Sequence, residues 1–125
     1  MRSLKRPLVV VATTAAVLVG TAGTAQAGTD RVATGPGAKV TFTSYGDSFK
    51  VCDTETDGLT VYNEYKYIRK DGTVQHDYEY NGLGNGTCAT YDHNFGEGRS
   101  VTFRACADLP GPLPDPCSAW VVGIA

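Results

Sequence analysis

Short runs rich in valine, threonine, tyrosine and phenylalanine recur along this chain from Lys39 to its end, each closed by glycine, aspartate, asparagine or proline. The runs return at intervals of about 8 to 12 residues, which is the strand spacing of an all-β sandwich and leaves no stretch for a helix of useful length. We therefore predict an immunoglobulin-like antiparallel β-sandwich of about seven strands. The expected strands are residues 39–45, 48–53, 59–69, 73–80, 87–93, 99–107 and 117–124.

The first 27 residues have the pattern of an export signal. They combine a basic start, an apolar run of 13 residues at 8–20 and the small-x-small triplet Ala-Gln-Ala at 25–27. Because a bilayer span needs about 20 apolar residues, we expect cleavage rather than a membrane anchor. The remaining 98 of the 125 residues suffice for one domain, which we divide into a flexible arm at 28–38 and a β-sandwich at 39–125. The mature protein is expected to be secreted, extracellular and monomeric.

Four cysteines follow the signal, at Cys52, Cys88, Cys106 and Cys117. An even number of cysteines in an exported chain, with no C-x-x-C pair, predicts two disulfides rather than a metal site. Three connectivities are possible. We favour Cys52 with Cys88 and Cys106 with Cys117, because the second pair closes a short loop between two expected strands. Each bridge would stabilise the fold by about 3 to 4 kcal/mol through loop-closure entropy.

The charge balance bears on the kind of partner. The mature chain carries 8 basic and 13 acidic side chains, a formal charge of −5. Nucleic acids and anionic membranes require clustered lysine and arginine, whereas the basic residues here are scattered along the sequence. We therefore expect neither partner, and instead an unknown protein or a polysaccharide outside the cell.

The tyrosines are concentrated in one expected hairpin. Asp71 and Gly72 predict a two-residue turn, which would place Tyr78 opposite Tyr65. If exposed, these rings could form a platform on which sugars stack, but aromatic residues at a period of two more often pack in a core. The face assigned to the core carries Val61, Tyr65, Tyr67, Val74, Tyr78 and Tyr80, and Val101, Phe103, Trp120 and Val122 are expected to pack against it.

The segment at 53–58 (Asp-Thr-Glu-Thr-Asp-Gly), with Glu64 at the twelfth position, follows the order of an EF-hand calcium loop. Its candidate ligands are Asp53, Glu55 and Asp57. However, Glu55 replaces the usual Asp or Asn, and both flanks have the pattern of strands instead of helices. We therefore interpret the segment as a polar β-turn and expect no metal and no cofactor.

Two histidines, His76 and His93, are the only ones in the chain. General-base or acyl-transfer chemistry would need one of them beside a serine and a carboxylate. The sequence has no Gly-x-Ser-x-Gly elbow and no paired-carboxylate signature, and oxidised cysteines offer no thiol nucleophile. We expect no catalytic residues and a function in binding.

The segment from Cys106 to Cys117 (CADLPGPLPDPC) holds four prolines among ten enclosed residues. A stiff exposed loop loses little entropy on binding, which a competitive inhibitor of a hydrolase requires. Small secreted bacterial inhibitors of proteases and amylases share this format of a disulfide-stapled β domain. The alternative is a plain connection between edge strands. The possible partner-binding residues are Leu109, Pro110, Leu113 and Pro114.

Three segments together resemble a group of small secreted actinobacterial proteins of the disulfide-stapled β-sandwich type. They are FKVCDTETDG at 49–58, the Glu97–Gly98 step into a strand that ends at Cys106, and the closing CSAW at 117–120. The resemblance covers most of the mature chain, but its motifs are cysteines, turns and a tryptophan. It therefore implies a fold and no assigned activity.

Overall fold

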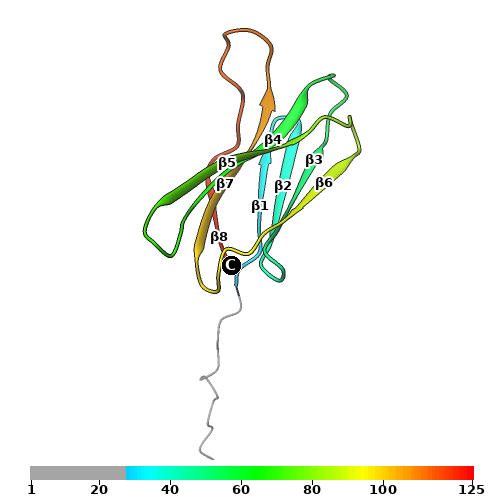
Figure 1. The fold of residues 1–125 in the computed structure, drawn as a ribbon. Coiled ribbons are helices and arrows are strands. Elements are labelled where there is room, and N and C mark those ends of the chain that lie inside the picture. The colour runs from blue at the N-terminus through cyan, green and yellow to red at the C-terminus, as the bar shows by residue number, and fades with distance from the viewer. Residues whose placement is uncertain (1–27) are drawn as a thin grey trace, which may run out of the picture.

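Within residues 28–125, eight antiparallel strands form two four-stranded sheets that face each other (Figure 1). The computed structural model describes residues 28–125, and the predicted signal peptide at 1–27 lies outside these residues. One sheet has the order β1-β2-β3-β6 and the other β5-β4-β7-β8. The strands are β1 (Arg31–Gly35), β2 (Ala38–Thr43), β3 (Ser48–Asp53), β4 (Thr60–Ile68), β5 (Val74–Asn81), β6 (Cys88–Asp92), β7 (Ser100–Asp108) and β8 (Val121–Ile124).

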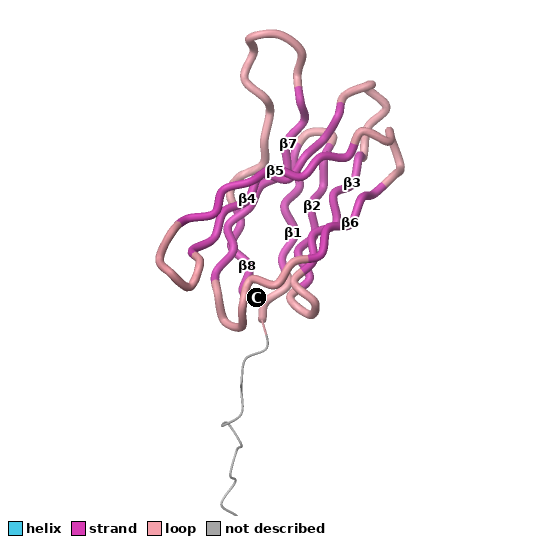
Figure 2. Tube along the Cα trace, viewed as in Figure 1, coloured by secondary structure: helices cyan, strands magenta, loops and turns pink. Residues whose placement is uncertain are grey.

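The chain crosses between the two sheets three times. Strands β1, β2 and β3 form a meander, after which the chain passes to the β4–β5 hairpin in the other sheet. It then returns to β6 beside β3 and crosses again to β7 beside β4, with β8 at the edge. Figure 2 shows strands joined by loops, without a helix in the described part of the chain. The all-β prediction is confirmed.

Both predicted disulfides are present. Cys52 and Cys88 are directly paired residues of β3 and β6, and their sulfurs are bonded. Cys106 near the end of β7 is bonded to Cys117 across an isolated antiparallel bridge. The first bridge therefore joins two neighbouring strands of one sheet, and the second closes the proline-rich loop.

The prediction of a flexible arm at residues 28–38 is wrong from Arg31 onward. Residues of β1 pair with β2, and Ala33 is buried in the core. The turn between the two strands consists of Pro36 and Gly37, and Gly37 has a φ of +75°. Such a proline–glycine pair suits a tight turn that requires a positive φ at its second position. Strand β1 was not predicted because its short, polar sequence has no clear hydrophobic pattern.

The core between the sheets is built around aromatic rings. Phe42, Phe49 and Phe103 are fully buried, and the ring centroid of Phe49 lies 5.2 Å from those of both other phenylalanines. Burial of each such side chain stabilises the fold by about 1.5 to 3 kcal/mol. The core also contains Ala33, Ala38, Val40, Val51, Val61, Tyr65, Phe95, Val101, Ala105, Ala107 and Ala125.

The β4–β5 hairpin differs from the predicted register by one residue. Its turn has three residues, 70–72, because Arg69 N donates to Thr73 O at 2.8 Å and Gly72 N donates to Arg69 O at 3.0 Å. Gly72 has a φ of +89°, as expected for the last residue of a three-residue hairpin loop. The Asp71 carboxylate accepts hydrogen bonds from the Thr73 amide at 2.9 Å and its hydroxyl at 2.6 Å.

This shift reverses which side of β5 faces the core, because side chains alternate between faces. Tyr78 pairs with Glu64 and not with Tyr65. Tyr65 is in the core, as predicted, but Tyr78 and Tyr80 lie on the outer face with exposed fractions of 45% and 48%. The prediction that Val74, Tyr78 and Tyr80 lie in the core is therefore wrong. The same prediction for Trp120 and Val122 is also wrong, because both side chains are exposed.

The inner side of β5 is polar, but its buried groups have partners. Glu79 Oε2 lies 2.7 Å from His93 Nε2, and Glu79 Oε1 accepts a hydrogen bond from Asn63 Nδ2 at 3.2 Å. Asn81 Nδ2 donates to the carbonyl of Val51 at 3.0 Å. The contact with Val51 joins β5 to the opposite sheet, that with His93 joins it to the segment after β6, and that with Asn63 joins it to the neighbouring strand β4. These hydrogen bonds offset the cost of burying polar groups.

Gly72→Ala should reduce the free energy of unfolding by about 1 to 2 kcal/mol, because alanine is disfavoured at a positive φ. Urea denaturation monitored by circular dichroism would measure the change. Gly82→Ala is the matched control: its φ is not positive and the added Cβ would lie an ordinary 3.6 Å from Thr60 Oγ1. Equal losses in both variants would contradict the assigned turn.

Candidate functional site

The outer face of the β5-β4-β7-β8 sheet gathers most of the exposed large apolar side chains. Six of the ten such residues in the described chain lie on it. A contiguous exposed apolar patch on a small protein commonly marks a binding surface. We call this surface the outer face, and its side chains are Tyr62, Glu64, Lys66, Ile68, Val74, His76, Tyr78, Tyr80, Thr102, Arg104, Cys106, Trp120 and Val122.

Three tyrosines form a cluster at one end of the outer face. The ring of Tyr62 lies 5.1 Å from that of Tyr80 and 6.0 Å from that of Tyr78, measured between centroids. Tyr62 is buried, whereas the other two rings remain about half exposed. Burial and the hydrogen bond to Asp115 raise the pKa of Tyr62 well above its usual value. The cluster therefore presents two accessible rings that rest on a third, neutral one.

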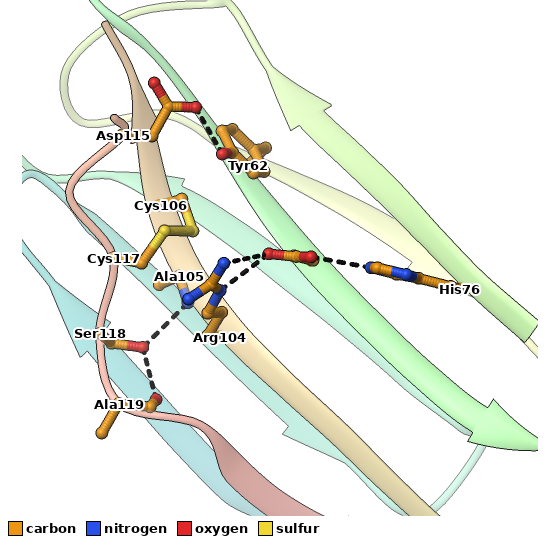
Figure 3. Close-up of polar contacts among 10 residues, drawn as sticks. Tyr62, His76, Arg104, Ala105, Cys106, Asp115, Cys117, Ser118 and Ala119 are labelled. Carbon is orange, nitrogen blue, oxygen red and sulfur yellow. Dashed lines mark hydrogen bonds and ion pairs between the residues drawn. A yellow bond between two sulfur atoms is a disulfide. The ribbon is translucent and has the colours of Figure 1, made fainter. Parts of the chain in front are cut away.

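Glu64 pairs with Tyr78 of β5 and Arg104 of β7 in the middle of the outer face, and its carboxylate contacts Arg104 and His76. Figure 3 labels Arg104 and His76, which lie on either side of the carboxylate that both contact. Its Oε1 accepts a hydrogen bond from Arg104 Nε at 2.8 Å and forms an ion pair with Nη2 at 2.7 Å, and its Oε2 lies 2.8 Å from His76 Nε2. Burial alone would raise the pKa of Glu64, but the hydrogen bonds and charges of Arg104 and His76 outweigh it and lower the pKa. The carboxylate is therefore ionised at neutral pH and fixes both neighbours across three strands.

Trp120 lies beside this network, against two cations. Lys66 Nζ and Arg104 Cζ are each 4.5 Å from the centroid of its ring. Cation–π contacts at partly exposed sites contribute about 0.5 to 1 kcal/mol each. They orient the indole on the outer face, where it remains partly accessible to a ligand.

The loop between Cys106 and Cys117 projects beyond the sandwich at the tyrosine end of the outer face (Figure 1). Asp115 closes the loop: its Oδ1 accepts a hydrogen bond from Leu109 N at 2.9 Å, and its Oδ2 accepts one from the Tyr62 hydroxyl at 2.6 Å. The hydrogen bond from Tyr62, followed by that from Leu109, lowers the pKa of Asp115. Of the predicted contact residues, Leu109 is half-buried, and Pro110, Leu113 and Pro114 are exposed.

Two of the three calcium candidates, Asp53 at the end of β3 and Asp57 in the following turn, accept backbone hydrogen bonds within this segment. Asp53 Oδ1 accepts a hydrogen bond from Glu55 N at 3.1 Å, and Asp57 Oδ1 accepts one from Leu59 N at 3.0 Å. Within residues 28–125, no group of three or more His, Cys, Asp or Glu side chains is arranged to hold a metal ion. Glu64, the twelfth residue of the sequence pattern, is bound to Arg104 on the outer face.

The two histidines lie on opposite sides of the sheet. His76 contacts Glu64 on the outer face, whereas His93 contacts Glu79 on the inner side and stacks on Phe95 with 4.8 Å between ring centroids. Each imidazole is thus paired with a glutamate rather than with a serine. The Arg104–Glu64–His76 network was not predicted from the sequence, because it joins residues on three different strands.

The comparisons with known proteins gave no matching family model, curated protein or solved structure. In residues 28–125 no helix is long and apolar enough to cross a membrane. The outer face and the loop beside it are therefore the features of this chain that bear on its function.

Glu64→Gln should lower the free energy of unfolding at pH 7 by about 1 to 3 kcal/mol, because it removes a charged acceptor from Arg104 and His76. Because the folded-state pKa of Glu64 is lowered, its contribution is present above the unfolded carboxyl pKa of about 4.3 and is lost as pH falls through the folded pKa.

Urea denaturation at a series of pH values would therefore show the two proteins converging in acid. Glu97→Gln, an exposed glutamate outside this network, is the control and should change little. A constant difference between wild type and Glu64→Gln down to strongly acidic pH would contradict the ionised network.

Proposed function

We propose that this protein is a small secreted, non-catalytic, immunoglobulin-like β-sandwich that acts by binding a polysaccharide at its outer face. The observation that carries the proposal is the accessible aromatic set of Tyr78, Tyr80 and Trp120 beside the Glu64–Arg104 pair. Two disulfides and a predicted signal peptide support an extracellular setting.

The immunoglobulin-like assignment has its support in the strand connections. In the lettering of the immunoglobulin fold, the neighbouring strands β3 and β6 of one sheet correspond to strands B and E. Strands β4, β7 and β8 of the other sheet correspond to strands C, F and G. In this assignment β5 is an added edge strand beside C, as in sandwiches that extend that sheet. The outer face is then the solvent side of the extended sheet.

Carbohydrate is the ligand class that best fits the residues of this face. Aromatic rings bury the apolar faces of sugar rings, and polar groups placed nearby fix orientation through hydrogen bonds. Tyr78 and Tyr80 supply both a ring and a hydroxyl. Arg104 is held in place by Glu64 before any ligand arrives, so little additional entropy is lost when it binds.

A depletion assay with insoluble cellulose, chitin, xylan and peptidoglycan tests this function. The oxidised chain 28–125 should be removed from solution by at least one of them, and Tyr78→Ala combined with Tyr80→Ala should weaken that binding at least about tenfold, since tenfold corresponds to about 1.4 kcal/mol. Tyr45→Ala is the matched control, because Tyr45 is 93% exposed in the β2–β3 turn, away from the outer face. No binding to any of the four, or equal binding by the double variant, would reject the proposal.

A hydrolase inhibitor is the second candidate, favoured by the projecting loop. The disulfide at its base and the double contact of Asp115 with Leu109 and Tyr62 hold the loop in one shape before binding. Such preorganisation reduces the entropy lost on binding to an enzyme. Leu113 at the exposed part of the loop is the side chain best placed to enter a specificity pocket.

Residual activity of secreted serine proteases and amylases, titrated with the mature protein, tests this candidate. If the loop inhibits, Leu113→Ala should weaken inhibition at least about tenfold. Replacement of residues 109–114 by glycine and serine should abolish inhibition while the amide spectrum of the sandwich is retained. Leu83→Ala, an equally exposed leucine in another loop, should have no effect. Absence of inhibition across the panel would exclude this role for those enzyme classes.

A further inference from the structure

Three cationic side chains line a hollow at the end of the sandwich opposite the Cys106–Cys117 loop. The hollow has a volume of about 260 Å³ and lies between the β4–β5 turn and the connection from β6 to β7. Arg69 and Lys70 come from the turn, and Arg99 comes from the connection. The sequence separates Arg99 from the other two by about thirty residues, so the scattered basic residues of the sequence are partly gathered by the fold. The other lining residues are Tyr67, Asn94, Phe95 and Gly96.

Both guanidinium groups are held in position by neutral acceptors. Arg99 Nη1 donates to the carbonyl of Ile68 at 2.7 Å, and Arg69 Nη1 donates to Thr73 Oγ1 at 3.0 Å. The backbone of Gly96 approaches Arg99 so closely that an added Cβ would lie 3.0 Å from Nε. Each arginine therefore keeps further N–H groups for a ligand and loses little side-chain freedom when it binds.

None of these three cations makes an ion pair with a carboxylate of residues 28–125, although the pKa of Asp71 in the same turn is lowered by its hydrogen bonds to Thr73 and also by the charge of Arg69. The ion pairs among residues 28–125 are those of Glu64 with His76 and Arg104 and of Glu79 with His93. The acids nearest in sequence, Asp71 and Glu97, do not line the hollow, and the Asp71 carboxylate accepts hydrogen bonds from Thr73. Three of the eight mature basic residues thus create a local positive potential on a chain with a formal charge of −5.

An aromatic wall completes the hollow. Tyr67 and Phe95 meet edge to face, with 4.5 Å between their ring centroids. Phe95 is part of the core, so this wall is supported from behind by the packed sandwich. The hollow therefore offers cationic donors on one side and an apolar surface on the other, which fits an oxyanion attached to a ring or a short carbon skeleton.

We propose that the hollow between Arg69, Lys70 and Arg99 is a second binding site, which takes the oxyanion of a phosphorylated or carboxylated ligand. Arg69 and Arg99 donate hydrogen bonds to the anion, Lys70 adds charge, and Tyr67 with Phe95 contacts the carbon skeleton. The site lies apart from the outer face and does not depend on the function proposed for that face.

Amide chemical-shift titrations of the oxidised chain 28–125 with inorganic phosphate and, separately, with sodium glucuronate test this site. Ionic strength is kept constant with sodium chloride. At least one anion should produce saturable shifts concentrated at residues 69–72 and 94–99. Stronger binding of phosphate assigns the site to a phosphorylated ligand, and stronger binding of glucuronate assigns it to a carboxylated one.

The variant Arg69→Gln with Lys70→Gln removes two charges from an exposed turn and should weaken binding at least about tenfold. Arg99→Gln should have a similar effect, and the amide spectrum of each variant reports whether the fold is retained. Lys39→Gln with Lys50→Gln removes the same charge from the other sheet and should leave the affinity unchanged. Shifts that do not saturate with either anion, or equal affinity in the Arg69 and Lys70 variant, would overturn the proposal.

Discussion

The Asp71 carboxylate, through its hydrogen bonds to Thr73, helps to fix a three-residue turn on which the character of two surfaces depends. The turn sets the register of β5 against β4, and side chains alternate strictly along a strand. One residue more or less in the turn would exchange the two sides of β5. The present register places Tyr78 and Tyr80 beside Tyr62 on the outer face. It also brings Arg69 and Lys70 to the edge of the cationic hollow.

The same register turns the polar side of β5 toward the interior. An edge strand with Glu79 and Asn81 buried would be unstable if these groups lacked partners. His93 and Asn63 satisfy Glu79, and the carbonyls of Val51 and Thr87 satisfy Asn81. Strands β3 and β4 and the segments that flank β6 thus supply partners for the inner side of β5, and the aromatic side of β5 is left available to solvent. The hydrogen bonds on the inner side of the sheet therefore stabilise the register that exposes the candidate binding surface.

Most strands could be predicted from the sequence because they depend on local spacing, and the short separation of Cys106 and Cys117 favoured their bridge and left Cys52 to pair with Cys88. Strand β1 was missed because Arg31–Gly35 is short and polar and gains its burial only from pairing with β2. The register of the hairpin was missed because Asp71 and Gly72 fit a two-residue and a three-residue turn alike. The hydrophobic pattern then favoured the two-residue turn, because that turn places Val74, Tyr78 and Tyr80 on the same side as Tyr65.

The candidate functional residues were harder to predict, because their positions depend on contacts between residues that are distant in sequence. The hydrophobic pattern of β5 favours its tyrosine side as the core side, and only the partners of Glu79, 14 and 16 residues distant in sequence, reverse that preference. Arg104 and Glu64 are 40 residues apart, and Arg99 lies 31 residues from the carbonyl of Ile68 that holds it. No periodicity in the sequence links such positions, so both the outer face and the cationic hollow became visible only in the fold.

Cross-strand nuclear Overhauser contacts between backbone protons of β4 and β5 distinguish the two possible registers of the hairpin. The three-residue turn predicts contacts that pair Glu64 with Tyr78 and Lys66 with His76. Contacts that instead pair Tyr65 with Tyr78 and Tyr67 with His76 would show a two-residue turn. That result would return the tyrosines to the core and remove the outer face as a binding surface.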